Sequence, residues 1–342
     1  MVAEIRDKSR LSVRFAQKQD VNMLMAFINK YWKNGHILSH DQELFEFLYL
    51  EKNGNLNFVI ATEVSTGRDV AILGFIPTNS SKSRVSVALW KAINDDHLRS
   101  LHAGLFCLKY LVDEIAPRSF LCVGIESKVT AVYNFLGYFT GVMSHHLIVN
   151  TRLASYKILK NPPHQNAISV EKSPANTFNL VSTMRQLETI SLKFEFNRYG
   201  KDIEYLKHRY IDHPRFKYSM HQILADAATL GLIVTRRCFA NNRSCLRIID
   251  VIGGETCLSA GIGALIEVMI NNHDEYIDLV AWGLDEGKLL QMGFVNRRLH
   301  EQCVVPEHFM PFVQQNKDIS IFTNLPGNEQ LFKGDGDMDR PN

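Results

Sequence analysis

The chain has 342 residues, 46% of them hydrophobic and 22% charged, which excludes general disorder and predicts a folded protein of two domains. Its formal net charge of +2, with lysines and arginines spread along the chain, argues against nucleic acid as the main partner. A charged N-terminus and the lack of an apolar run of about 20 residues predict a cytoplasmic protein with neither signal peptide nor membrane span.

The cysteines and histidines predict no metal site. No Cys-x-x-Cys pair occurs, and the adjacent His145 and His146 would point to opposite faces of a predicted strand. The cysteines fall mostly in apolar runs, which predicts buried free thiols in a reducing compartment. They are Cys107, Cys122, Cys238, Cys245, Cys257 and Cys303.

The first half of the chain alternates strand and helix patterns. Residues 11–16 predict a strand, residues 20–32 a helix capped by Asp20, and residues 41–50 a second helix. The β-rich runs 57–64 and 70–77, joined by turn residues, predict a hairpin that residues 84–93 extend. A helix at 101–115, a strand at 119–126, a helix at 129–137 and a strand at 142–150 complete the order β-α-α-β-β-β-α-β-α-β.

The second half repeats the end of this order. After a predicted linker at 160–174 come helices, strands at 230–238 and 244–253, a helix at 256–271, a strand at 276–283 and a short segment ending at residue 294. Residues 260–262 match residues 103–105 at an offset of 157 (261 minus 104), and Gly293 matches Gly137 at an offset of 156 (293 minus 137). These offsets predict a tandem duplication; chance alignment of helix-end glycines is the alternative.

The segment 126–142 carries the strongest motif. Val129, Tyr133, Gly137 and Tyr138 follow the spacing A-x-x-x-Y-x-x-x-G-F. Here, and in the order of its elements, the chain resembles the GNAT superfamily of acyl-CoA-dependent N-acyltransferases. The resemblance implies an α/β (α+β) protein of two tandem GNAT-like domains, each a mixed, mostly antiparallel sheet flanked by helices. It also implies that Tyr133 protonates the CoA thiolate, although an aromatic ring on a buried helix face is the alternative.

The resemblance also implies an acyl-CoA site in the first half. Arg99 and Gly104 fit the pyrophosphate-binding motif R/Q-x-x-G-x-G/A, whereas His102 replaces its first glycine; an ordinary helix start is the alternative. The later half has Leu289 where Tyr133 stands, so residues 1–160 are expected to catalyse and residues 161–342 to form a degenerate copy that contributes to the acceptor site. The implied CoA-binding residues are Trp90, Lys91, Ala92, Ile93, Arg99, His102, Ala103, Gly104, Leu105 and Asn134.

Three further segments, 29–49, 196–218 and 324–342, resemble a narrower group. This group is the GNAT N-acyltransferases that act on nucleotide-linked amino sugars of bacterial surface polysaccharides, including dTDP-3-amino-3,6-dideoxyhexoses. His36 is then the candidate base, with a water chain as the alternative. The implied substrate-binding residues are Trp32, His40, Arg209, Tyr210, Arg215, Tyr218, Asp337, Asp339 and Arg340.

The implied function is transfer of an acyl group from acyl-CoA to the amine of a dTDP-linked amino-dideoxy sugar, in O-antigen or capsule biosynthesis. Candidate donors are 3-hydroxybutanoyl-CoA and acetyl-CoA, and no metal is required. One rival is an aminoacyl- or peptidyl-transferring GNAT-like enzyme, against which the lack of a basic run counts. The other rival is a non-catalytic acyl-CoA-binding regulatory module, against which Tyr133 counts.

Overall fold

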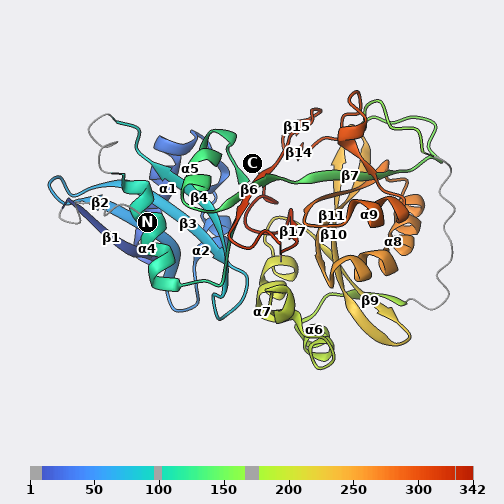
Figure 1. Cartoon of the computed structure of the whole chain (residues 1–342), viewed down its shortest axis with the longest axis horizontal. Coiled ribbons are helices and arrows are strands. Elements are labelled where there is room, and N and C mark those ends of the chain that lie inside the picture. Colours follow the sequence, from blue (N-terminus) through green and yellow to red (C-terminus); the bar gives the residue numbers. More distant parts are fainter. Residues whose placement is uncertain (1–9, 96–101, 166–176, 328, 342) are drawn as a thin grey trace. The chain divides into compact units, whose positions relative to one another are not determined.

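The computed structural model describes residues 10–95, 102–165, 177–327 and 329–341 (Figure 1). The chain forms two compact units. Unit 1 comprises Met1–Thr140, Phe322–Asn324 and Gly336–Asn342, and unit 2 comprises Gly141–Ile321 and Leu325–Asp335. The C-terminal part of the chain therefore contributes to both units.

The sheet of unit 1 is mixed, with the strand order β1-β2-β3-β4-β5-β16-β6. Strands β1 to β4 pair antiparallel, which confirms the predicted β2–β3 hairpin, and β4 pairs parallel with β5. The bounds are β1 Leu11–Gln17, β2 Asn55–Glu63, β3 Arg68–Pro77, β4 Arg84–Ala92, β5 Ser119–Ile125, β16 Ser320–Thr323 and β6 Phe139–Val142.

Helices cover both faces of this sheet. Phe15 of β1 lies opposite Val59 of β2, so Phe58 points to the other face because successive side chains alternate. Phe15 contacts Tyr110 of α4 (Ala103–Ile115), with ring centroids 5.2 Å apart. Phe58 contacts Tyr49 of α2 (Gln42–Tyr49), with centroids 4.6 Å apart. The other helices of unit 1 are α1 (Val21–Phe27), which continues into a π-helical turn (Ile28–Trp32), and α5 (Thr130–Phe135).

The two predicted helix starts in the first 50 residues have different outcomes. Asp41 caps α2, since its carboxylate accepts a hydrogen bond from the Leu44 N–H at 3.0 Å. The predicted Asp20 cap is wrong. Asp20 has helical φ and ψ (−84° and −4°), and its carboxylate instead accepts two hydrogen bonds from Arg14 and one from the Gln17 N–H.

The sheet of unit 2 has the order β13-β7-β12-β11-β10-β9-β8, with β17 also paired to β12. The strand predicted at 142–150 is β7, and it pairs with β12 and β13, whereas the sequence placed it last in the first domain. Its Leu147 and Ile148 are buried in the hydrophobic clusters of unit 2, which accounts for this membership. The bounds are β7 Ser144–Val149, β8 Thr177–Val181, β9 Ser219–Ala225, β10 Ala228–Ala240, β11 Arg243–Ile252, β12 Tyr276–Trp282, β13 Val295–Asn296 and β17 Leu331–Phe332.

The main helix of unit 2 is α8 (Gly254–Asn271), which lies beside the sheet (Figure 1). It buries Leu258, Leu265 and Met269 in the core cluster, as an amphipathic helix on a sheet does. The other elements are α6 (Met184–Ser191), α7 (Ile203–Leu206), a π-helical turn at Lys207–Ile211, α9 (Glu286–Gln291) and a two-stranded ribbon of β14 (His308–Phe309) and β15 (Phe312–Val313).

The prediction of buried free thiols is confirmed. All six cysteines are free and buried. Within the described residues no helix is long and apolar enough to span a membrane. The same part of the chain holds no group of three or more potential metal-ligating His, Cys, Asp or Glu side chains.

Candidate functional site

The candidate site lies where β4 and β5 separate. The two strands pair in parallel only at three positions, Arg84 with Ser119, Val85 with Phe120 and Ser86 with Leu121. Beyond Ser86 they part, and the register between β3 and β4 also shifts. A cavity of about 250 Å³ occupies this split. It is lined by Trp32, Val87, Ala88, Trp90, Lys91, Ala92, Cys122, Val123, Gly124, Ile125, Glu126, Lys128, Val129, Tyr133, Asp337, Met338 and Arg340.

Trp90 ties the cavity to the start of α4. Its indole N–H donates to the Gly104 carbonyl at 2.9 Å, and its ring lies 5.4 Å from the ring of Tyr133. A Cβ at residue 104 would lie 3.0 Å from the indole nitrogen, so the helix can approach this closely because residue 104 is glycine. The structure thus brings the predicted residues Trp90, Gly104 and Tyr133 together.

Tyr133 closes one end of the cavity. Its side chain is 2% exposed and stacks on Phe322, with centroids 4.1 Å apart. Burial, assisted by the nearby Cys122 thiol, raises the pKa of Tyr133 well above its ordinary value. The phenol therefore stays protonated at neutral pH and can act as a hydrogen-bond or proton donor.

The C-terminal segment of the chain forms another wall. Gly336 lies against Ser86 of β4, and Met338 lies against Gly124 of β5. The Asp337 carboxylate accepts hydrogen bonds from the Tyr49 hydroxyl at 3.3 Å and from Arg340 at 2.8 Å. Predicted acceptor-binding residues 337 and 340 are therefore part of the same cavity as Tyr133.

His36 lies beside this wall. It is buried, its Nδ1 is 3.2 Å from the Leu38 N–H, and its Nε2 is 3.0 Å from Nη2 of Arg340. Burial, followed by the Arg340 cation, lowers the pKa of His36 to about 4, so the ring is neutral at pH 7. Two donors, the Arg340 guanidinium and the Leu38 N–H, thus face a neutral ring that has a single accepting nitrogen, so His36 has no free nitrogen to take a proton from a substrate while these contacts last.

The remaining predicted CoA-binding residues have varied positions. His102 is exposed and precedes α4 with φ of 50° and ψ of 32°, the left-handed region that glycine favours, which fits the glycine of the motif. Ala103 and Ile93 are buried, and Leu105 is half-buried. Asn134 is exposed and accepts a hydrogen bond from the Thr140 hydroxyl at 2.9 Å. Arg99 lies outside the described residues.

The remaining predicted acceptor-binding residues divide between the units. In unit 1, Trp32 lines the cavity, His40 is exposed in its loop, and Asp339 is 1% exposed. The other four belong to unit 2: Arg209 and Tyr210 are buried, Arg215 is exposed and Tyr218 is half-buried. The Tyr210 hydroxyl donates to Asp250 at 2.6 Å.

Unit 2 has a similar split, but its own backbone fills it. Strands β11 and β12 pair in parallel at three positions, from Leu246 to Ile248. Beyond them β17 pairs antiparallel with β12, and the Gly334 N–H donates to the Ile249 carbonyl at 2.8 Å. Leu289, which replaces the tyrosine, is buried in the core of this unit. The split of unit 2 therefore leaves no room for a ligand beside β12 where β17 lies.

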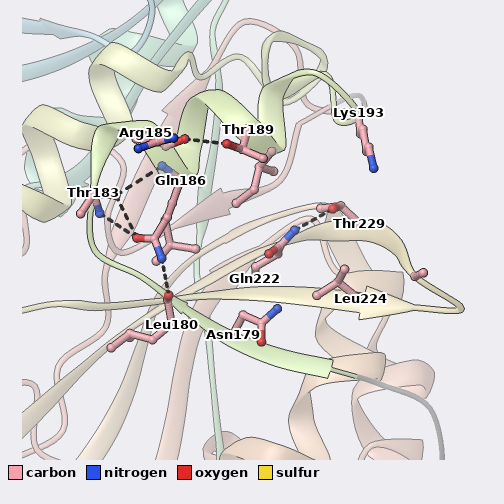
Figure 2. A pocket seen from close by; sticks show the side chains of 13 residues that line it. Asn179, Leu180, Thr183, Arg185, Gln186, Thr189, Lys193, Gln222, Leu224 and Thr229 are labelled. Atoms are coloured by element: carbon pink, nitrogen blue, oxygen red, sulfur yellow. Dashed lines mark hydrogen bonds between the residues drawn. The ribbon is translucent and has the colours of Figure 1, made fainter.

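A surface groove of unit 2 lies between α6 and the strands β8 and β9 (Figure 2). Its polar side chains bond within the protein: Gln186 donates to the backbone carbonyl of Leu180, and Gln222 donates to the Thr229 hydroxyl. Arg185 and Lys193 are its only ionisable lining residues. The groove thus lacks the acid and base groups of an active site.

Among the cavity residues that sequence reasoning missed are Cys122, Gly124 and Met338, and it also missed Tyr49, which donates to Asp337 but does not line the cavity. A signal existed only for Gly124, because a lone glycine within a predicted strand marks a bulge or a close approach of another chain segment. Its φ of +97° and its contact with Met338 fit that signal.

Comparisons with known proteins bear on the fold of the chain. No protein-family model and no curated protein matches the chain. A GCN5-related N-acetyltransferase from Anabaena variabilis ATCC 29413 superposes with a TM-score of 0.54 at 12% identity, over 92% of this chain and 72% of that one. A conserved protein of unknown function from Enterococcus faecalis V583, described as a probable N-acyltransferase, has a TM-score of 0.54 at 10% identity, over 94% of this chain and 74% of that one. The chain therefore has an α+β fold with two mixed sheets, consistent with tandem GNAT-like domains, as predicted.

Proposed function

We propose that the protein is an acyl-CoA-dependent N-acyltransferase whose acceptor is the amino group of a dTDP-linked 3-amino-3,6-dideoxyhexose. The observation that carries the proposal is the open split between β4 and β5, with Trp90 and Tyr133 in one cavity. In unit 2 the corresponding split is filled by β17. Unit 1 is thus the proposed acyl-CoA site, and unit 2 the degenerate copy.

The donor fits this cavity chemically. Beyond Ser86, β4 no longer pairs with β5, so its edge offers backbone N–H and C=O groups to the amide groups of a CoA arm. The start of α4, next to Trp90, is proposed to hold the pyrophosphate, because helix N-termini offer free N–H groups and a favourable dipole. Lys91 and Lys128 add positive charge to the lining.

The reaction follows from these positions. The neutral amine attacks the thioester carbonyl, and the C–N bond forms as the C–S bond breaks. A backbone N–H of β4 at Trp90 to Ile93 stabilises the oxyanion, and Tyr133 donates its proton to the departing CoA thiolate. The amine gives up its extra proton to water. Of the two proton acceptors expected from the sequence, the contact between His36 and Arg340 favours water.

The acceptor class is supported by the resemblance of segments 29–49, 196–218 and 324–342 to enzymes of nucleotide-linked amino sugars. Two of these segments contribute Trp32, Asp337 and Arg340 to the cavity. The third segment belongs to unit 2; its Arg209 is buried, whereas its exposed Arg215 and half-buried Tyr218 have chemistry that suits a phosphate and a base.

The test is release of CoA thiol from a panel of acyl-CoAs, including acetyl-CoA and 3-hydroxybutanoyl-CoA. Each is offered with dTDP-3-amino-3,6-dideoxygalactose or its gluco epimer. dTDP-6-deoxygalactose, which carries a hydroxyl in place of the amine, is the matched control. Release that requires the amino sugar supports the proposal. Release with a different amine only would refute the acceptor class, and measurable CoA binding without release to any amine would refute the enzyme.

A further inference from the structure

Asp337 brings a buried carboxylate into the cavity of unit 1. Two carboxylates line this cavity, Asp337 and Glu126. The Glu126 side chain is 65% exposed and pairs with Lys128, whereas Asp337 is 4% exposed. Asp337 is therefore the carboxylate that a ligand inside the cavity would meet away from bulk water, where its interactions are strongest.

The contacts of Asp337 leave one oxygen available. Oδ2 accepts from the Tyr49 hydroxyl and from Nη1 of Arg340, which also donates to the Asp337 carbonyl at 2.7 Å. Within the part of the chain that the structure describes, no residue donates to Oδ1. A carboxylate oxygen can accept two hydrogen bonds. Oδ1 is not among the fully buried polar atoms that lack a partner, so it is accessible and can accept from a ligand or from water in the cavity.

The charges around Asp337 select the kind of donor. Arg340 neutralises the carboxylate, and His36 beside it is uncharged at pH 7. Lys91 also lines the cavity, and the charge of Lys128 there is balanced by its partner Glu126. A protonated amine would add a further cation to this group, whereas a neutral amine only donates a hydrogen bond. The site therefore favours the neutral amine, which is the form that attacks a thioester.

The position of Asp337 suits attack on a carbonyl held near Tyr133. Asp337, Tyr133 and Cys122 of β5 all line the same cavity of about 250 Å³. An acceptor on the Asp337 side and a leaving thiolate on the Tyr133 side would then flank one acyl carbon.

We propose that Oδ1 of Asp337 accepts a hydrogen bond from the neutral amino group of the acyl acceptor and so selects and orients it, while Arg340 and Tyr49 hold the carboxylate. This assignment rests on the proposed N-acyltransferase function. It makes Asp337 a specificity-determining residue supplied by the end of the chain.

The test compares D337N and Y49F with D20N in the full-length protein. Asp20 is the matched control, because it is also a nearly buried aspartate of unit 1 paired with an arginine, but it does not line the cavity. Steady-state kinetics are measured with one acyl-CoA and an acceptor panel of both dTDP-amino sugars, the free 3-amino sugar, spermidine and a lysine peptide. Melting temperature and binding of CoA alone report the integrity of each variant.

D337N should raise the KM for every amine that supports release of CoA thiol by about tenfold or more. This is the loss expected when a hydrogen bond to a charged group is removed. The KM of acyl-CoA and the binding of CoA should change less than about twofold. Y49F should act in the same direction by a smaller factor, and D20N should change neither KM.

The outcomes separate the two proposals. Release with a dTDP-amino sugar but an unchanged amine KM in D337N overturns the role of Asp337 and leaves the function standing. Release only with another amine, with a raised amine KM in D337N, supports Asp337 and refutes the acceptor class. Equal effects of D337N and D20N, or no release with any amine, overturn the role of Asp337.

Discussion

Met338 and Gly124 approach each other so closely that a Cβ at residue 124 would lie 2.1 Å from the Met338 sulfur. Gly124 also has φ of +97°, which L side chains rarely adopt. Glycine is therefore needed at this position of β5 for two reasons. Its backbone has a positive φ, and Met338 of the C-terminal segment packs directly against it.

Gly124→Ala should displace the C-terminal segment from the cavity wall. Gly137→Ala is the control, since its φ of +85° brings similar strain with no atom within 4 Å of the new Cβ. Strain alone costs roughly 1–2 kcal/mol. G124A should lower the melting temperature more than G137A does, and it should also raise the acceptor KM. M338A in the G124A background should recover part of the loss in melting temperature. Identical effects of G124A and G137A would contradict the packing of Met338 against residue 124.

Tyr133→Phe should lower kcat by about 100-fold or more, because the departing thiolate loses its proton donor. Since burial raises the pKa of Tyr133, the wild-type rate should not fall through ionisation of this phenol up to about pH 9. CoA release across pH 6–9 measures both effects. Tyr138→Phe is the control, because Tyr138 is a neighbouring half-buried tyrosine outside the cavity lining. An unchanged kcat in Y133F at every pH would remove Tyr133 from the mechanism.

Lys201→Met should destabilise unit 2 by about 3–5 kcal/mol, the cost of leaving buried charges without their partner. Lys201 donates to both carboxylate oxygens of Asp250, at 2.6 and 2.7 Å, and lies 3.1 Å from Asp335. Lys207→Met is the control, because Lys207 and its partner Asp212 are 34% and 41% exposed, and such pairs contribute less than about 1 kcal/mol. Urea unfolding measures the difference, and comparable midpoints for the two variants would contradict a structural role of the buried pair.

His36 should make the fold less stable as the pH falls from about 6.5 to about 4. The pKa of His36 is about 4 in the folded protein, against 6.5 for an ordinary histidine such as that of the unfolded chain. Between these two pH values the unfolded chain therefore binds the additional proton. The loss is on the order of 3 kcal/mol at about 1.4 kcal/mol per pKa unit. In His36→Gln the decrease in stability between pH 7 and pH 4.5 should be smaller.

Urea unfolding at the two pH values measures this difference. His145, His146 and His221 also have lowered pKa values, but they titrate equally in both proteins and cancel. His40→Gln, in the same loop but exposed, is the control. A pH dependence that H36Q leaves unaltered would show that His36 titrates normally.

Local patterns predicted local structure well. The β-rich runs at 57–64 and 70–77 with their turn residues were enough for the β2–β3 hairpin, and the pattern at 41–50 was enough for α2. The predicted cap at Asp20, by contrast, was wrong. Arg14, on the preceding strand, attracts that carboxylate more strongly than the helix N–H groups do.

Long-range pairing could not be predicted. The sequence pattern of β7 predicts a buried strand. The membership of β7 in unit 2, however, depends on contacts with β12, more than 120 residues away. β8 and β9 were missed because their apolar residues are few and interrupted by polar ones. Within the site, Tyr133 was suggested by the resemblance of its segment to a family motif, whereas the hydrogen bond of Tyr49 to Asp337, at a separation of 288 residues, has no signal in either segment alone.

Residues 337, 338 and 340 line a cavity whose other walls come from residues 32–133. During synthesis, β1 to β5 can emerge and pair long before this wall exists, since domains fold N-terminal first as the chain is made. The nascent protein is therefore expected to complete this cavity only after residues 337–340 have left the ribosome. Shorter nascent chains would then carry Tyr133 without Asp337 and Arg340.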